Sequence, residues 1–365
     1  MEERKININT IAKAAKVSTT TVSNFINGTE MLPISQDTRM RIRSVMRELN
    51  YRPHIGGVLM RRNLMRRSKV GFILGDDCAC PPLHVAGTPL VSRLLVELEH
   101  ALDFRLNLGL EILQIKDEDS RSEWNAKLLD LDCVINFGQI NGLMFDTLFR
   151  RNVPLIEIYS AKELRMHGDV AGCGGEFDFL YWRNDRQIGQ LFDHFYACGA
   201  RRFLFISSCN VKDRRPEYYG FDAEAKLQGF LRALKAHSDA EGNVISPRNA
   251  NDFNMFREFE LTRELLKNEP AMLTNVDAVI CHNDIVAHGV ASAAMEMGKL
   301  PGRDFQLSGE GNFREFQYWY PHFITSSADY AELTCRVCEL IELRRSGATE
   351  DFREIEIPTL LLERS

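Results

Sequence analysis

Hydrophobic residues in the first fifty positions recur at the spacing of short amphipathic helices. The pattern predicts a helix over 8–17, a tight turn at Val17-Ser18, and a second helix over 19–26 that ends at Asn27-Gly28. A third helix begins after Ser35, and its apolar residues can close a small core: Ile42, Val45, Met46 and Leu49. Two short helices around a small-residue turn, followed by a third, predict a helix-turn-helix module.

The second of these helices exposes a run of short polar side chains. Hydroxyl and amide groups of this length can contact base edges and phosphates without burying an unpaired charge. Helix propensity does not explain three consecutive threonines, because β-branched residues are only moderate helix formers. A capped helix with no ligand is the alternative interpretation. The candidate residues for DNA contact are Thr19, Thr20, Thr21, Ser23 and Asn24.

From Lys69 onward, short apolar runs alternate with longer amphipathic stretches. Such alternation predicts parallel sheets flanked by helices, and ligands in these folds lie beyond the carboxyl ends of the strands. Two sheets that face each other form a cleft that hinge closure can seal. The predicted strands are 70–74, 109–115, 133–137, 154–158, 203–206 and 278–281, and the predicted helices are 90–102, 123–129, 186–198 and 226–236.

Charge is distributed unevenly along the chain. Residues 1–69 carry 14 Lys and Arg against 5 Asp and Glu, whereas the remainder carries 31 against 46. A small basic head on a large acidic body is typical of a polyanion-binding module joined to a domain whose own net charge keeps it soluble. A solvated basic face is the alternative that charge alone leaves open. At 365 residues, the chain is long enough for two or three domains.

The remaining composition argues against several other classes of protein. No apolar run is long enough for a membrane span, and the polar N-terminus leads us to expect no export. The 9 cysteines include the close pairs Cys78/Cys80 and Cys335/Cys338, but neither has a second pair or a histidine cluster at metal spacing. We therefore expect buried free thiols in a reducing cytoplasm, and neither a metal nor a cofactor.

Two segments of the head closely resemble the DNA-binding domain of the lactose-repressor (LacI/GalR) family: Ile11 to Asn27, and Thr38-Arg39 through Leu49 to Pro53. The resemblance implies that Thr19, Thr20 and Asn24 occupy the base-contacting positions. It also implies positions near the DNA phosphates for Ser18, Thr21, Ser23, Asn27 and Tyr51. The loop from Gly28 to Ile34 is about two residues longer than is usual in the family, a departure that affects the loop contacts.

Family members carry a short hinge helix after the head, which inserts an apolar residue into the minor groove. Met60 falls at that wedge position here, with Arg61 and Arg62 placed to neutralise phosphates. The adjacent Gly56 and Gly57 depart from the pattern, since each glycine weakens a helix by about 1 kcal/mol relative to alanine. We expect this hinge to be hard to order, and a plain flexible linker is the alternative.

The resemblance extends over the rest of the chain and implies a two-lobed, periplasmic-binding-protein-like sensor. Within 281–289, Asp284 aligns with an acidic residue that accepts hydrogen bonds from the effector; a helix-capping role is the alternative. Lys226 replaces a usual arginine, and Phe253 matches a ring that stacks on the effector, although core packing is equally possible there. Tyr219 and Asp222 belong to the loop that enters the cleft.

Three departures from the family pattern fall near the expected cleft. Residues 76–89 form a longer loop that is rich in Cys and Pro, and residues 160–182 have the character of an insertion. An expected acidic pair is missing around Gly309-Glu310-Gly311-Asn312. These differences predict an effector outside the familiar set.

The sequence thus predicts an all-α helix-turn-helix head plus an α/β two-lobed periplasmic-binding-protein-like sensor domain of two doubly wound parallel sheets. The expected divisions are 1–53 for the DNA-binding domain, 54–68 for the hinge and 69–365 for effector binding and dimerisation. Within the sensor, the N-lobe is expected at about 69–183 plus 302–332 and the C-lobe at about 184–301 plus 333–365.

The expected function is that of a cytoplasmic, nucleoid-associated homodimeric transcriptional regulator, acting as a repressor on double-stranded operator DNA. A small-molecule effector, a sugar or a related metabolite, would control it. A solute-binding protein or an enzyme on the same fold is the alternative. The sequence contains no phosphate-binding glycine loop and no nucleophile elbow, and the basic head opposes a transport role.

Overall fold

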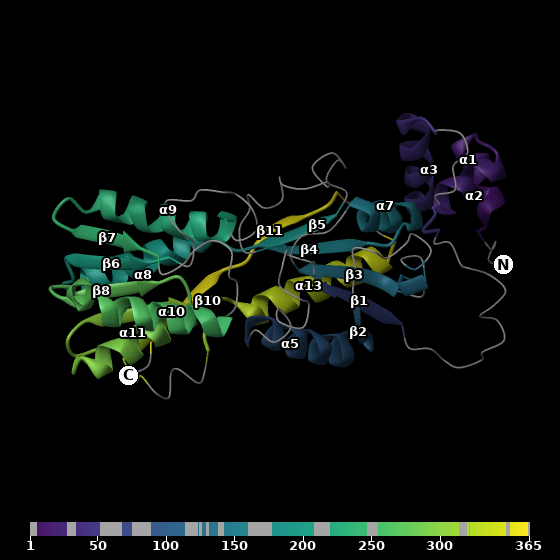
Figure 1. Ribbon diagram of the computed structural model, residues 1–365. Helices are drawn as coiled ribbons and strands as arrows, with labels where there is room; N and C mark the ends of the chain where they lie inside the picture. Colours follow the sequence, from purple (N-terminus) through teal and green to yellow (C-terminus); the bar gives the residue numbers. More distant parts are fainter. Residues whose placement is uncertain are drawn as a thin grey trace.

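The computed structural model describes residues 6–27, 34–51, 68–74, 89–113, 123, 126–128, 131–137, 142–159, 177–207, 220–246, 255–313, 320, 322–347 and 351–363. Figure 1 shows an elongated molecule with a helical head at one end and two sheets placed one after the other along its length. The predicted hinge at 54–68 lies outside the described residues except for Ser68.

The head contains the three predicted helices: α1 (Ile8–Ala15), α2 (Thr19–Asn27) and α3 (Gln36–Glu48). Each begins at a polar cap. The Asn7 side chain accepts a hydrogen bond from the Thr10 N–H of α1, and the Ser35 hydroxyl accepts one from the Thr38 N–H of α3. The three helices close a core that includes Ile11, Ala15, Val22, Phe25, Ile42 and Met46, as the apolar spacing predicts.

The first lobe of the sensor is built on a sheet of six strands in the order β11-β5-β4-β3-β1-β2. All of its neighbouring strands run parallel. Helices α5 (Pro89–Leu106) and α13 (Tyr330–Arg345) cover one face, and α7 (Gly142–Arg151) covers the other. The strands are β1 (Lys69–Leu74), β2 (Gly109–Leu113), β3 (Leu131–Phe137), β4 (Leu155–Tyr159), β5 (Asp178–Tyr181) and β11 (Glu354–Glu356).

The second lobe has another six-stranded sheet, in the order β12-β10-β9-β8-β6-β7. Its neighbours are parallel except that β12 runs antiparallel to β10. Helices α8 (Asn184–Ala197) and α9 (Gly220–Ala236) pack on one face, while α10 (Met255–Asn268), α11 (Asp284–Glu296) and the 3-10 helix η3 (Pro270–Leu273) pack on the other. The strands are β6 (Arg202–Ile206), β7 (Glu241–Ile245), β8 (Ala278–Cys281), β9 (Gln306–Glu310), β10 (Phe323–Ala328) and β12 (Thr359–Leu362).

The chain divides between the lobes differently from the sequence expectation. Strands β9 and β10 join the second sheet, although the sequence analysis placed them in the first lobe. Conversely, α13 packs into the core of the first lobe and β11 joins its sheet, although most of α13 and all of β11 were expected in the second. The apolar pattern shows that each strand is buried but not which sheet it pairs with, because pairing is a long-range property.

The carboxyl ends of the two sheets face each other. Strand β5 ends at Tyr181 and the chain enters α8 of the second lobe, whereas β10 ends at Ala328 and the chain enters α13 of the first. Each crossing therefore leaves one sheet at its carboxyl edge and arrives at the other lobe. This is the edge at which open α/β sheets bind ligands. No helix in the described parts of the chain is long and apolar enough to span a membrane.

Candidate functional site

Helix α2 belongs to the head at one end of the molecule (Figure 1). Its inner face buries Val22, Phe25 and Ile26 in the head core, which leaves Thr19 and Thr20 exposed. The Ser18 hydroxyl accepts a hydrogen bond from the Thr21 N–H at 3.0 Å. That contact caps the amino end of α2.

The other predicted DNA-contacting residues differ in exposure. Ser23 and Asn24 are half-buried on α2, and Thr21 lies 2.8 Å from Ser18, hydroxyl to hydroxyl. The ring of Tyr51 is buried against the head core, and this burial raises its pKa above the usual value. The Asn27 side chain, Met60 and Arg61 lie outside the described residues.

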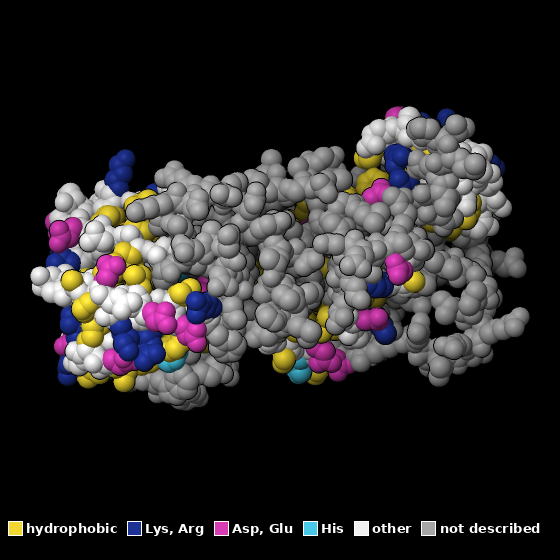
Figure 2. Space-filling model, viewed as in Figure 1, with side chains coloured by type: hydrophobic (Ala, Val, Ile, Leu, Met, Phe, Trp, Pro, Cys, Tyr) yellow, Lys and Arg dark blue, Asp and Glu magenta, His cyan; other side chains and the backbone are white. Residues whose placement is uncertain are grey.

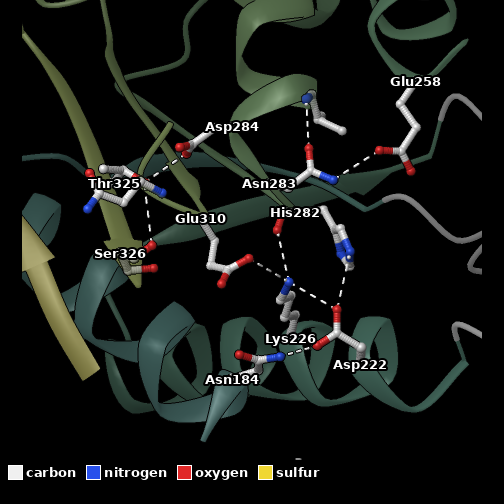
Figure 3. A network of polar contacts seen from close by, with 12 residues as sticks. Asn184, Asp222, Lys226, Glu258, His282, Asn283, Asp284, Glu310, Thr325 and Ser326 are labelled. Atoms are coloured by element: carbon white, nitrogen blue, oxygen red, sulfur yellow. Dashed lines mark hydrogen bonds and ion pairs between the residues drawn. The ribbon is translucent and has the colours of Figure 1, made fainter. Parts of the chain in front are cut away.

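A cluster of charged side chains occupies the carboxyl edge of the second sheet (Figure 3). The Lys226 ammonium lies 3.0 Å from Asp222 Oδ2, one turn earlier on α9, and 3.3 Å from Glu310 Oε2 at the end of β9. It also donates to the carbonyl oxygen of His282 at 3.2 Å. The imidazole of His282 lies 3.4 Å from Asp222, and the Asn184 amide donates to the same carboxylate. We call these five residues the polar cluster.

Burial and charge oppose each other in the polar cluster. Burial lowers the pKa of Lys226, but the carboxylates of Asp222 and Glu310 outweigh it and hold that pKa above its usual value. Burial raises the pKa of Asp222, yet the charges of Lys226 and His282 keep it below its usual value. Glu310 keeps a raised pKa, since burial there exceeds the effect of Lys226. Lys226 is therefore a permanent cation between two carboxylates.

Asp284 lies next to the polar cluster, but its oxygens are bound by the protein itself. One accepts from the Phe313 N–H at 2.7 Å and the other from the Thr325 hydroxyl at 2.8 Å. Burial raises its pKa to about 7, and those two hydrogen bonds counter only part of the rise. The cap of α11 is Asn283, whose side chain accepts from the Val286 N–H, so Asp284 holds the loop after β9 to strand β10.

A glycine makes the position of Asp284 possible. A Cβ atom at Gly309 would lie 2.5 Å from Asp284 Oδ1, closer than any side chain tolerates. The absence of a side chain thus lets β9 pass against the start of α11. Beside it, the Asn283 amide donates to Glu258 at 2.9 Å.

Several buried polar atoms on or beside the segments that connect the two lobes have no hydrogen-bond partner among the described residues. They are Trp182 Nε1 and Asn184 Oδ1 after β5, Ser326 Oγ in β10 and Tyr330 Oη at the start of α13. A buried polar atom without a partner costs free energy, so each of these atoms is a candidate for contact with a ligand or water. Burial raises the pKa of Tyr330 well above the usual value, and the Glu310 carboxylate adds to the rise.

The structure thus brings together Lys226 and Asp222 from the predicted set and places Asp284 beside them. Phe253 and Tyr219 lie outside the described residues. Sequence reasoning did not select Asn184, His282 or Glu310. His282 and Asn283 directly follow β8, and ligand-binding residues gather at the carboxyl ends of buried strands. This position could have indicated His282 from the sequence. Among the described residues, no group of three His, Cys, Asp or Glu could hold a metal ion.

Comparison with protein families matches both parts of the chain. Residues 7–54 match the model of bacterial regulatory proteins of the lacI family, and residues 192–365 match that of the periplasmic binding protein-like domain. The chain belongs to the LacI family. The head is the family's DNA-binding domain and the two lobes are its sensor, so this LacI-family member is a DNA-binding transcriptional regulator with a small-molecule effector domain.

Relatives of this LacI-family chain span its whole length. The uncharacterized HTH-type transcriptional regulator YvdE of Bacillus subtilis is 24% identical over 362 residues, which cover 97% of this chain and 98% of the relative. The transcriptional repressor PurR of Pectobacterium atrosepticum is 23% identical and covers 98% and 95%.

Solved structures share the fold of the chain. A complex of the transcriptional regulator CelR with cellobiose has a TM-score of 0.60 at 18% identity and covers 99% of both chains. The Lac repressor dimer bound to operator and an anti-inducer has a TM-score of 0.58 at 16% identity and covers 98% of both.

Proposed function

We propose that this regulator binds operator DNA through α2 and is controlled by a hydroxyl-rich metabolite, a sugar or a close relative, at the polar cluster. The observation that carries the proposal is the arrangement of Asp222 and Glu310 around Lys226 at the carboxyl edge of the second sheet. Both carboxylates keep part of their surface exposed, 20% and 12% of the side chain, whereas the lysine is almost fully covered.

Ion-paired carboxylates of this kind suit a neutral ligand with many hydroxyl groups. Lys226 neutralises part of their charge, so a ligand need not bring a cation of its own. The remaining oxygens accept hydrogen bonds from hydroxyl donors, and Asn184 Oδ1 offers another acceptor. The relatives agree with this chemistry, because solved neighbours contain cellobiose, ribose and lactose.

For the DNA interface we propose that Thr19, Thr20 and Asn24 contact base edges, and that Ser18, Thr21, Ser23, Asn27 and Tyr51 lie near phosphates. The exposure of the first two threonines supports the proposal. Met60 and Arg61 complete it as a minor-groove wedge and a phosphate contact. The functional divisions follow as 1–53 for the head, 54–68 for the hinge and 69–365 for the sensor. We place the site of action on the nucleoid in the cytoplasm, where the DNA partner is.

We propose further that the chain acts as a homodimer. Helix α5 exposes Val96 and Phe104, with 69% and 83% of each residue accessible, and His100 stacks on Phe104 with ring centroids 6.1 Å apart. Ile112 on the adjacent edge strand β2 is also half-exposed. Figure 2 shows hydrophobic, acidic and histidine side chains at this lower edge of the molecule. A second copy would cover this apolar strip and supply the second head for a palindromic site.

Control of DNA binding would then be a coupling between two sites. An effector that bridges the lobes favours one relative arrangement of them, and the arrangement determines how the two heads are spaced. We propose repression as the outcome of DNA binding, as in the relatives named repressors. We also propose that the chain acts by binding alone and performs no catalysis.

The proposal can be tested with the purified full-length chain. Selection from a pool of random duplexes should enrich a pseudo-palindromic sequence, called here the selected duplex. A panel of monosaccharides and disaccharides should then contain a compound that raises the unfolding temperature and shifts affinity for that duplex. Asp222→Asn should remove the thermal shift and leave DNA affinity unchanged. Arg303→Ala, which removes an exposed charge from the second lobe, should retain both responses. Failure to enrich any sequence would refute the DNA-binding part, and an unchanged thermal shift in Asp222→Asn would refute the assigned ligand site.

A further inference from the structure

The DNA-binding head is packed directly against the first lobe of its own sensor. Phe149 on α7 contacts both hydrophobic cores, that of the head and that of the lobe. Its ring meets the Phe25 ring of α2 edge-on, with centroids 6.3 Å apart, and stacks near Phe145 on the lobe side at 6.4 Å. The Phe149 side chain thus bridges the head and the first lobe, which residues 54–68 connect in sequence.

Two buried arginines reinforce this contact from opposite sides. Arg150 of α7 donates to the Phe25 carbonyl oxygen at 2.9 Å while it pairs with Asp146 at 2.8 Å. Arg43 of α3 donates in the other direction, to the Phe149 carbonyl oxygen, and its guanidinium lies 3.7 Å from the centre of that ring. Both arginines are about 95% buried, with 5% and 6% of each residue accessible. Buried, charge-assisted hydrogen bonds of this kind specify one geometry.

Further contacts extend the interface around the head. The Asn152 side chain, just after α7, donates to the Tyr51 carbonyl oxygen at 3.3 Å. Arg47 of α3 lies over the Phe352 ring at 5.1 Å, and Asn50 lies against Gly347 beyond α13. These residues come from α7 and from the chain after α13, both parts of the first lobe (Figure 1). We call this interface the head dock.

The head dock leaves the two exposed threonines of α2 free. It uses the carboxyl end of α2 and the outer side of α3, whereas Thr19 and Thr20 at the amino end of α2 remain exposed. The dock is therefore compatible with DNA contact through those threonines. The hinge sequence adds a reason for such an interface, because Gly56 and Gly57 make an ordered hinge helix costly.

We propose that Phe149, Arg150 and Arg43 are positioning residues for DNA binding. They hold each head on its sensor in an orientation that can bind DNA, so α7 passes changes in the first lobe to the head without relying on hinge order. The inference rests on DNA binding by the head, as proposed above. Preorganisation of this kind increases affinity because less orientational freedom is lost on binding.

A disulfide across the head dock tests the geometry. A Cβ atom at Gly347 would lie 3.3 Å from the Asn50 Cβ, close to the roughly 3.5–4.5 Å span of a disulfide. In Asn50→Cys/Gly347→Cys, peptide mapping after mild oxidation should find the 50–347 linkage in most chains, with and without the selected duplex. The oxidised protein should bind that duplex within about threefold of the reduced protein. Asn50→Ser/Gly347→Ser controls for backbone strain, since Gly347 has a φ of 77°.

A second measurement tests the contribution to affinity. Arg150→Ala should bind the selected duplex about tenfold more weakly, the effect expected from one lost hydrogen bond to a charged group. The affinity of Arg150→Ala should depend on salt concentration as the affinity of the wild type does, because Arg150 bonds to protein and not to phosphate. Arg303→Ala, which removes an arginine paired with Asp304 in the other lobe, should bind like the wild type.

The outcomes separate this inference from the proposed function. If the wild type enriches a duplex but Arg150→Ala binds it equally well, the head dock has no role in affinity and the inference fails alone. Tighter binding by Arg150→Ala, or loss of DNA binding on oxidation of the cysteine pair, would show that the dock stores the head in an inactive position and would overturn the proposal. If the wild type enriches no sequence, the proposed function fails first.

Discussion

Lys226 on α9 lies 3.3 Å from Glu310 at the end of β9, and this contact joins a helix on one face of the second sheet to the sheet's carboxyl edge. The two residues are 84 positions apart in the chain. Because Asp222 contacts the same ammonium, removal of the lysine leaves two carboxylates facing each other in a mostly buried site. The polar cluster therefore supports the fold as well as the proposed ligand site.

Lys226→Met should lower the free energy of unfolding by about 3–5 kcal/mol, since it removes one partner of a buried ion pair and leaves the opposing charges uncompensated. Chemical denaturation at neutral pH measures the loss. Adding Asp222→Asn to the same chain should restore part of it, because one of the two unpaired charges disappears. Lys267→Met, at an exposed pair with Glu296, should change stability by no more than about 0.5 kcal/mol. Equal losses at the two lysines would contradict this account.

Asn24→Ala should relax the sequence preference of the head. A bidentate amide contact to a base contributes about 1–3 kcal/mol of discrimination, so the variant should lose roughly that much preference at one position of each half-site. Competition binding with single-base variants of the selected duplex measures this change. Lys13→Ala, which removes an exposed charge from α1, should instead weaken binding to all sequences alike. Asn24 would not contact a base if its replacement left the whole profile intact.

Phe104→Glu should disrupt the dimer. A charge on the exposed strip of α5 would be buried without a partner in the paired state, which we expect to raise the dissociation constant roughly 30-fold or more. Sedimentation velocity at micromolar concentration measures the shift toward monomer. Leu231→Glu places the same charge at another exposed apolar position, on α9, where 40% of the leucine is accessible, and should leave the assembly unchanged. A dimer that survives Phe104→Glu must use a different face.

Glu157 should make stability depend on pH. It is buried in the first sheet, and burial raises its pKa to about 8 even though the hydrogen bond from Asn136 at 2.9 Å opposes the rise. The folded chain then holds this proton more tightly than the unfolded chain. Its contribution to stability is full below about pH 4.5, falls as the pH rises toward about 8, and is constant above that.

Glu157→Gln has no proton to lose at this site. Its unfolding free energy relative to the wild type should therefore rise between pH 5 and pH 8, as measured by urea denaturation at several pH values. Glu111→Gln, on the exposed edge strand β2, controls for the loss of a carboxylate from the same sheet. A constant difference between Glu157→Gln and the wild type across this range would rule out a proton on Glu157.

Local patterns in the sequence predicted the head helices and part of the sensor. The three head helices follow from cap residues and apolar spacing, both of which act within a few positions. The pairing of Asp222 with Lys226 is also local, because residues four apart share one face of a helix. It was not predicted, since the sequence analysis placed Asp222 on a loop and began the helix at 226, whereas α9 begins at Gly220. The sequence analysis did not predict strands β5, β7, β9, β10, β11 and β12 or helices α7, α10, α11 and α13. Strand β7, for example, has a half-polar sequence and lies at an exposed edge.

Contacts that depend on sheet pairing could not be predicted in the same way. Glu310 belongs to a segment that sequence reasoning noted only for lacking an expected acidic pair, yet it supplies one of the two carboxylates around Lys226. The packing of α13 on the first lobe includes Arg344, which donates two hydrogen bonds to Asp178, 166 positions away, at 2.6 and 2.8 Å. Apolar periodicity carries no information about such distant partners.

The last described stretch of the chain supplies one margin of each sheet, with β11 beside β5 in the first and β12 beside β10 in the second. A nonsense codon just beyond Gly347 would therefore remove an edge strand from both halves of the sensor at once. Neither half can be cloned as one uninterrupted stretch of the gene, and a frameshift late in the gene should destabilise both halves.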